Sequence, residues 1–225
     1  MATTVGEMAA DLLSCHTNVA RYRQVPIIFE NYDHKLFQML AAPPDISGGA
    51  LLFATALAQW AIFIGPALLI LIWVLGNRLD RRAAVGACLT GLFALAMAGA
   101  ISSLYLHPRP FMNGDAANFL QHAPDSSFPS DHATVLFALG WFLMIVPPPH
   151  LRAAWIVPIV LAGVVGWSRI FLGAHYPIDI AGASLIALIS AFLLSSTMGR
   201  KLSSMLTAWA ERIYEWPLSI FRSGG

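Results

Sequence analysis

Residues 51–76 read LLFATALAQWAIFIGPALLILIWVLG, a stretch without a single charged side chain. An α-helix rises about 1.5 Å per residue, so this stretch is long enough to cross a hydrocarbon layer about 30 Å thick. Core helices of soluble proteins rarely sustain an apolar run of this length. The stretch therefore predicts a membrane-spanning helix.

Four more apolar runs follow, at residues 83–106, 133–149, 153–173 and 180–199, and only the third of these contains a charge, Arg169. We therefore predict an all-α integral membrane protein with about five transmembrane helices. The composition agrees, because only 11% of the residues are charged, against about 25% in a soluble domain. It argues against a soluble or disordered chain, and the net charge of +1 argues against a nucleic-acid partner.

The segments outside the runs divide the chain into three parts. Residues 1–50 are expected to form an interfacial N-terminal segment, residues 51–200 the membrane domain, and residues 201–225 a cytoplasmic tail. Residues 26–41 mix apolar and charged side chains, which favours an amphipathic helix in the interface; a sixth, weakly hydrophobic span is the alternative. Cys15 and Cys88 do not make a disulfide framework, and Cys88 is expected to be buried in its apolar run.

Basic residues mark one side of the predicted membrane domain. They occur between the first and second runs, between the third and fourth, and after the fifth: Arg78, Arg81, Arg82, Arg152, Arg200 and Lys201. These three segments fall on the same side of the membrane, which the positive-inside rule identifies as cytoplasmic. The N-terminus, residues 107–132 and the segment around His175 then lie outside.

Polar residues collect at the outer ends of the spans, where they are costly and therefore tend to be functional. Prolines on both sides hold Arg109 at the end of the second span. The third span begins with Phe128-Pro129-Ser130-Asp131-His132. Ser130 or Asp131 is expected to cap this helix, and a helix N-terminus also favours anions.

The fourth span ends in Ser168-Arg169, and His175 and Asp179 follow. Pro177 suits the first position of the fifth helix, which places Asp179 in its first turn, within reach of His175. A carboxylate beside an imidazole fixes the tautomer and stabilises the cationic ring. Because arginine side chains and helix N-termini bind phosphate, these residues predict chemistry on a phosphate-bearing substrate reached from the membrane.

The three blocks resemble the signature of the type 2 phosphatidic acid phosphatase (PAP2) superfamily, which is Lys-x6-Arg-Pro, Pro-Ser-Gly-His and Ser-Arg-x5-His-x3-Asp. Two positions differ: Ser102 stands in place of the lysine and Asp131 in place of the glycine. Residues 108–111, 118–123, 127–132 and 173–179 look like the bacitracin-resistance undecaprenyl-diphosphate phosphatases. The resemblance implies a PAP2-type helical bundle and covers about residues 50–200.

The resemblance also implies roles for individual residues. His175 would attack phosphorus and form a phosphohistidine, Asp179 would orient His175, and His132 would act as acid and base. The groups that hold the phosphate oxygens would be Arg109, Ser130 and Arg169. Asp131 belongs to the same phosphate-binding block, and our hypothesis is that it pairs with an arginine or with His132.

No cofactor and no metal is expected, so activity should survive a chelator; surface or supporting roles are expected for His107 and His122. The implied substrate is a polyprenyl diphosphate among membrane lipids. The implied setting is the inner membrane of a bacterium, with the active site facing the periplasm, where the enzyme would recycle the cell-wall lipid carrier and confer bacitracin resistance.

Other functions remain open on the sequence alone. The three blocks do not separate this substrate from phosphatidic acid, phosphatidylglycerol phosphate or a lipid A phosphate. A catalytically silent lipid transporter on the same frame is a further alternative. The oligomeric state is not indicated.

Overall fold

The computed structural model describes residues 27–223, and within them the side chains of residues 31–213. These residues form helices and loops without a β-strand, apart from an isolated bridge between Pro108 and Ser126. The helices are α2 (Ile27–Leu40), α3 (Gly48–Trp60), α4 (Ile64–Leu75), α5 (Arg78–Leu104), α6 (Asp131–Ile145), α7 (Ile156–Phe171), α8 (Pro177–Ser195) and α9 (Thr197–Ser223), with short 3-10 turns η1 (Ala61–Phe63) and η2 (Pro110–Met112).

Each of the five apolar runs forms a helical rod, which confirms the predicted all-α membrane fold. Three rods are long and apolar enough to cross a membrane: Gly48–Leu75, Arg78–Leu104 and Pro177–Ser195. The first of these contains α3, η1 and α4. The other two, α6 and α7, are shorter than expected, with 15 and 16 residues. The α6 helix stops at Ile145 because the prolines at 147–149 lack the N–H groups that would continue it.

The central helix of the bundle is α6, which packs against α5, α7 and α8. Its apolar side chains point in several directions, and Leu136, Phe142 and Leu143 are almost fully buried. Glycines on the neighbours let the helices approach closely. An added Cβ at Gly86 of α5 would lie 2.3 Å from the ring of Phe142, so any larger residue there would displace this ring.

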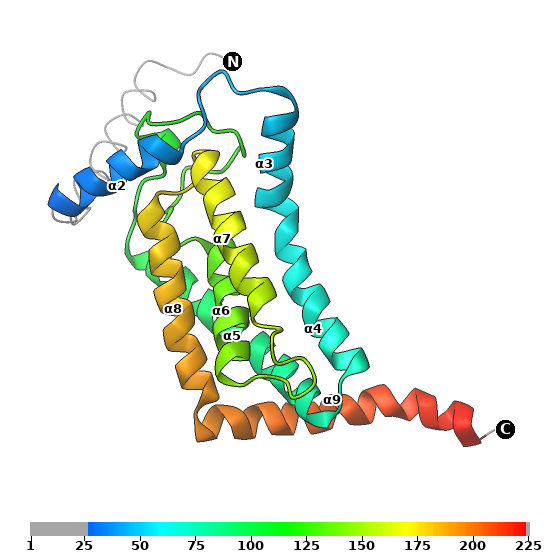
Figure 1. The fold of residues 1–225 in the computed structure, drawn as a ribbon. Coiled ribbons are helices and arrows are strands. Elements are labelled where there is room, and N and C mark those ends of the chain that lie inside the picture. Colours follow the sequence, from blue (N-terminus) through cyan, green and yellow to red (C-terminus); the bar gives the residue numbers. More distant parts are fainter. Residues whose placement is uncertain (1–26, 224–225) are drawn as a thin grey trace, which may run out of the picture.

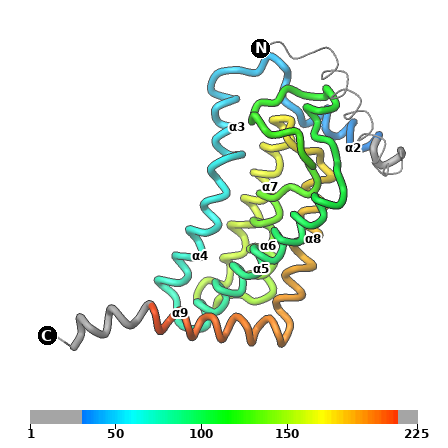
Figure 2. Tube along the Cα trace, turned by 180° about the vertical axis from the view of Figure 1, so that it is seen from behind, coloured from blue at the N-terminus to red at the C-terminus, as the bar shows by residue number. Residues whose placement is uncertain are grey.

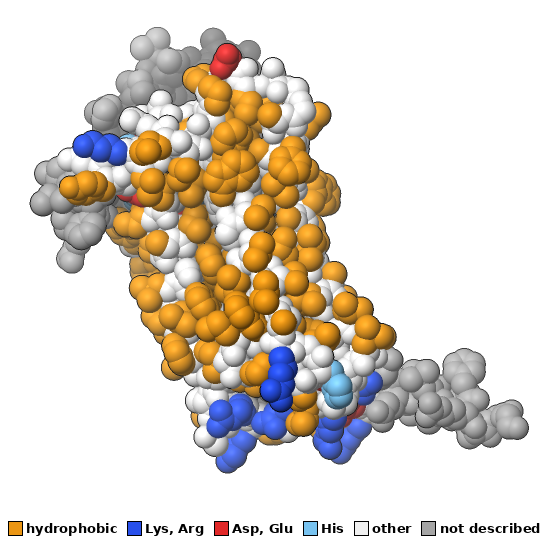
Figure 3. All heavy atoms as spheres, in the orientation of Figure 1, with side chains coloured by type: hydrophobic (Ala, Val, Ile, Leu, Met, Phe, Trp, Pro, Cys, Tyr) orange, Lys and Arg blue, Asp and Glu red, His pale blue; other side chains and the backbone are white. Residues whose placement is uncertain are grey.

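The two ends of the bundle differ in chemistry. Figure 1 shows α2 and the green loops after α5 at one end, and α9 lying across the other. Lys and Arg side chains gather at the α9 end, and apolar side chains cover the flank between the ends (Figure 3). A soluble monomer rarely exposes so much contiguous apolar surface. The arrangement fits a bundle whose flank faces lipid.

Two expectations change in the structure. The C-terminal helix begins at Thr197, directly after α8, because the chain turns at Ser196; Figure 2 shows this turn from behind. Cys88 is exposed on α5, so it belongs to the lipid-facing surface and the prediction that it is buried was wrong. The α2 helix (Ile27–Leu40) falls within residues 26–41, where an amphipathic helix is expected; its interfacial position stays a prediction, and residues 1–26 lie outside the described residues.

Candidate active site

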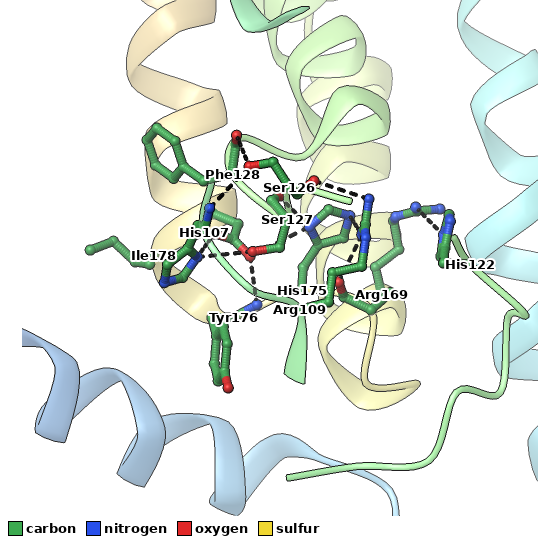
Figure 4. Close-up of polar contacts among 12 residues, drawn as sticks. His107, Arg109, His122, Ser126, Ser127, Phe128, Arg169, His175, Tyr176 and Ile178 are labelled. Atoms are coloured by element: carbon green, nitrogen blue, oxygen red, sulfur yellow. Dashed lines mark hydrogen bonds and ion pairs between the residues drawn. The ribbon is translucent and has the colours of Figure 1, made fainter. Parts of the chain in front are cut away.

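The three sequence blocks meet at the end of the bundle opposite α9. Arg109 precedes η2, Ser130 and His132 begin α6, Arg169 lies in the last turn of α7, and the His175 turn leads into α8. The backbone N–H of Ser130 donates to the carbonyl of Asp179 at 3.4 Å, which ties the start of α6 to the start of α8. Figure 4 shows the polar contacts that result.

A tight turn between α7 and α8 presents His175. Gly173 has φ +72°, and a Cβ there would lie 2.5 Å from Ala116; the turn therefore requires glycine on both counts. His175 is 2% exposed, and its Nδ1 lies 2.8 Å from the carbonyl oxygen of Ser127. A carbonyl only accepts, so Nδ1 carries the hydrogen and Nε2 carries the lone pair.

The protonation state of His175 follows from its surroundings. Burial lowers the pKa of the ring to about 4; the hydrogen bond to Asp179 acts in the opposite direction, and the charge of Arg169 adds to the lowering. The imidazole is therefore neutral at physiological pH. A buried neutral imidazole with an unprotonated Nε2 is a competent nucleophile.

Asp179 lies behind His175, as the sequence predicts. Its Oδ2 accepts from the backbone N–H of Tyr176 at 2.8 Å and lies 3.4 Å from His175 Nδ1. Its Oδ1 lies 3.0 Å from Nδ1 of His107, which is also 2.9 Å from the Ser127 hydroxyl. The carboxylate is thus shared by two histidines, and His107 is a supporting residue of the site.

Arg109 lies on the other side of His175. Its Nη1 donates to the carbonyl of Ala174 at 2.9 Å and lies 3.4 Å from His175 Nε2. Its Nε donates to the carboxylate of Asp125 at 2.7 Å, and the Asp125 side chain is 63% exposed. The guanidinium is therefore beside the reactive nitrogen, with an exposed carboxylate as its partner.

Arg169 is 3% exposed and points into the same region. Its Nη1 donates to the carbonyl of Ala58 at 3.3 Å, and its Nη2 donates to Nε2 of His122 at 2.8 Å. Its Nε is buried with no hydrogen-bond partner within the described part of the chain. An unused N–H on a buried cation is suited to an anionic ligand.

The start of α6 differs from expectation in two respects. Ser130 is the N-cap residue but makes no side-chain cap, and its Oγ is buried without a partner among the residues described. Asp131 is exposed, and it forms no ion pair within residues 31–213. Among the described residues, the Ser130 side chain therefore does not cap α6, and Asp131 does not pair with an arginine or with His132. His132 follows in the first turn, half-buried.

The α2 helix packs against the turn that carries His175. Asp33 accepts from the backbone N–H of Ile178 at 2.9 Å, at the start of α8, and Nδ1 of His34 lies 3.2 Å from the carboxylate of Asp115. Asp115 also accepts from the Tyr176 hydroxyl at 2.5 Å. These contacts join α2, the loop after α5 and the catalytic turn, and no sequence pattern pointed to them.

The remaining candidates do not add a metal or a cation. Ser102, at the position of the superfamily lysine, directs its hydroxyl to the carbonyls of Ala98 and Phe128 at 3.0 and 3.1 Å. Among the described residues, no group of three or more His, Cys, Asp or Glu is arranged to hold a metal ion. The permanent cations around His175 are Arg109 and Arg169.

Known proteins resemble this chain in sequence and in fold. The PAP2 superfamily matches residues 83–203. YbjG of Escherichia coli (strain K12), provisionally named an undecaprenyl-diphosphatase, is 32% identical over 85% of this chain and 96% of its own length. The undecaprenyl-diphosphatase BcrC of Bacillus subtilis (strain 168) is 34% identical over 61% of this chain and 69% of its own.

The crystal structure of a transmembrane PAP2-type phosphatidylglycerolphosphate phosphatase from Bacillus subtilis has the same fold. It superposes with a TM-score of 0.53 at 21% identity, covering 83% of this chain and 92% of the other. The superfamily match spans more than half of the chain and contains the blocks around Ser130, Arg169 and His175, which the fold brings together. The chain thus belongs to the PAP2 superfamily, as a membrane-embedded phosphatase.

Proposed function

We propose that this enzyme hydrolyses undecaprenyl diphosphate to undecaprenyl phosphate and inorganic phosphate. The observation that carries the proposal is the unprotonated Nε2 of buried His175, 3.4 Å from the Arg109 guanidinium. The names of the relatives YbjG and BcrC support the choice of a polyprenyl diphosphate. The apolar flank of the bundle gives the lipid chain a place beside the site.

In the first step, Nε2 of His175 attacks the terminal phosphorus. The N–P bond forms as the bond from phosphorus to the bridging oxygen breaks, and undecaprenyl phosphate leaves with the electron pair. Positive charge develops on the ring, and the Asp179 carboxylate beside Nδ1 stabilises it. The N–H groups of Arg109 and Arg169, with the hydroxyl of Ser130, hold the non-bridging oxygens.

In the second step, water attacks the phosphohistidine. His132 takes a proton from the water as its oxygen bonds to phosphorus, the N–P bond breaks, and inorganic phosphate leaves. The ring nitrogens of His132 form no hydrogen bond with another described residue, so they are available for this proton transfer. The leaving group of the first step is a phosphate ester, which is more acidic than an alcohol, so His132 contributes less to that step than to the second.

We place the site on the outer, periplasmic face of a bacterial inner membrane. Most Lys and Arg side chains visible in Figure 3 gather at the α9 end of the bundle. The turn between α7 and α8, which carries His175, lies at the other end (Figure 1), and the positive-inside rule assigns the basic end to the cytoplasm. In this orientation the enzyme returns the cell-wall lipid carrier to its monophosphate form. Bacitracin, which sequesters the diphosphate, is then less toxic to cells that overproduce the protein.

The test is phosphate release by the purified protein from a panel of lipid phosphates and diphosphates in detergent. We expect undecaprenyl diphosphate to be the preferred substrate, His175→Ala to be inactive, and an acid-labile phosphoprotein to accumulate in His132→Ala during the first turnover. Preference for phosphatidic acid, phosphatidylglycerol phosphate or a lipid A phosphate would replace the proposed substrate. Lipid transport without phosphate release would refute an enzymatic role.

A further inference from the structure

A short loop before α6 holds His122 in a defined position. The side-chain amide of Asn118 donates to the carbonyl of His122 at 2.9 Å, and its oxygen accepts from the backbone N–H of His122, also at 2.9 Å. Gln121 has φ +53°, a conformation that costs a non-glycine residue roughly 1 kcal/mol or more. The chain thus accepts local strain to place this imidazole.

His122 lies on the Arg169 guanidinium, on the side away from His175 (Figure 4). Because a guanidinium only donates, the 2.8 Å contact from Nη2 makes Nε2 of His122 an acceptor. Burial, followed by the charges of Arg169 and Arg109, lowers the pKa of His122 to about 4. The ring is therefore neutral in the ligand-free protein.

A diphosphate presents one phosphate more than the site beside His175 accounts for. In the proposed mechanism, the transferred phosphate is held by Arg109 and by the Nε of Arg169, which has no partner among the described residues. The Ser102 hydroxyl is already directed to two backbone carbonyls. The phosphate that stays on the lipid must then lie beyond one of the two guanidinium groups. On the far side of Arg169, the polar side chain in contact with the guanidinium is His122.

We propose that His122 is a specificity-determining residue that binds the lipid-linked phosphate of a diphosphate substrate. The inference rests on the proposed function and deepens it. An oxygen of that phosphate takes the Nη2 hydrogen bond of Arg169, which releases Nε2 of His122. Nε2 then takes up a proton from solvent and donates to the same phosphate, so binding adds a third cation to the site.

The charges that face His122 decide whether it takes up this proton. Arg169 on α7, Arg109 before η2 and His175 in the catalytic turn oppose protonation, and Asp125 in its own loop favours it; His132 on α6 faces the same space. A bound diphosphate reverses this balance, because its negative charge is closest to the ring. A monophosphate held at His175 does so much less.

The test compares two non-hydrolysable probes, farnesyl methylenediphosphonate and farnesyl phosphonate, as competitive inhibitors of the full-length enzyme in detergent. We expect His122→Ala to weaken binding of the diphosphonate about tenfold, the effect of losing a charge-assisted hydrogen bond, and to leave the monophosphonate nearly unchanged. Gln121→Ala keeps the imidazole and the same backbone strain, and is the matched control.

A second readout separates binding from a structural role. Calorimetry in two buffers of different ionisation enthalpy should show proton uptake with the diphosphonate by wild type, and less by His122→Gln. Equal loss of affinity for both probes, or unchanged proton uptake, would overturn the inference while wild type still cleaves undecaprenyl diphosphate. Failure of wild type to cleave that lipid would overturn the proposed function instead.

Discussion

His107 offers a direct test of how the site holds its nucleophile. Asp179 is fully buried and has three N–H partners, from His107 at 3.0 Å, Tyr176 at 2.8 Å and His175 at 3.4 Å. His107→Phe keeps an aromatic ring beside Tyr105 and removes the N–H donor. His107→Asn removes the ring and keeps a donor close to the position of Nδ1.

The expected magnitude follows from the charge of the acceptor. A hydrogen bond to a charged group contributes about 1.5–3 kcal/mol, and the two remaining donors place the loss at the lower end. Without its partner on Oδ1, the carboxylate can rotate away from the already long contact to His175. We therefore expect His107→Phe to slow the first phosphoryl transfer about tenfold, the factor that corresponds to about 1.4 kcal/mol.

The assay is single-turnover release of the lipid monophosphate, with KM and thermal stability measured in parallel. We expect His107→Asn to recover most of the rate, although it loses the aromatic contact, and KM to change little in both variants. Equal first-turnover rates in wild type and His107→Phe would refute the positioning role. So would a His107→Asn variant no faster than His107→Phe, since the aromatic packing would then be what matters.

Three other changes probe the same site. Ser130→Ala should lower activity by about tenfold or more, as for the loss of a hydrogen bond to charged phosphate. It should leave the melting temperature unchanged or higher, because the buried Oγ has no hydrogen-bond partner among the described residues; a matching loss of stability would contradict this. Asp125 competes with the substrate for Arg109, so Asp125→Asn should lower KM. The expected change is up to about fivefold, because an exposed ion pair contributes at most about 1 kcal/mol. A raised KM would show that Asp125 positions the arginine instead. Burial lowers the pKa of His175 from 6.5 to about 4 in the folded protein, so between these pH values the unfolded state binds more protons than the folded state. The free energy of unfolding should therefore fall as the pH drops from about 6.5 to 4. Denaturant titrations of His175→Gln should show a smaller fall.

The spans were predictable because hydropathy is local. The hydropathy of a run such as 51–76 predicts a spanning helix without information from the rest of the chain. Pro177 and Asp179 likewise indicate the start of a helix within three residues. The lengths of α6 and α7 were less predictable. The central helix α6 ends before the proline-rich segment 147–149, and α7 packs against α6 and α3 with Ile156 and Val160 exposed on its other side. Contacts between distant segments therefore bear on both lengths.

The contacts inside the site depend on tertiary structure, and here the sequence was a weaker guide. His107 and Asp179 are 72 positions apart, and nothing in the local pattern separates His107 from a surface residue. Ser130 occupies a cap position, which predicted a capping bond, but its hydroxyl makes no side-chain cap and has no partner within the part of the chain that the structure describes. Asp131 was expected to find a cationic partner, and its exposure at the mouth of α6 leaves it without one among the described residues.

The two arginines of the site already donate to acceptors within the protein: Arg109 to Asp125 and two carbonyls, and Arg169 to His122 and the carbonyl of Ala58. A phosphate that binds to the arginines displaces these acceptor groups, which remain close to the guanidinium groups. Two guanidinium groups without internal acceptors would bind inorganic phosphate tightly in a buried site, and the product would then inhibit the enzyme. When the phosphate product leaves, the acceptor groups of the protein take back the N–H groups of the two arginines. These internal partners therefore favour turnover over retention of product.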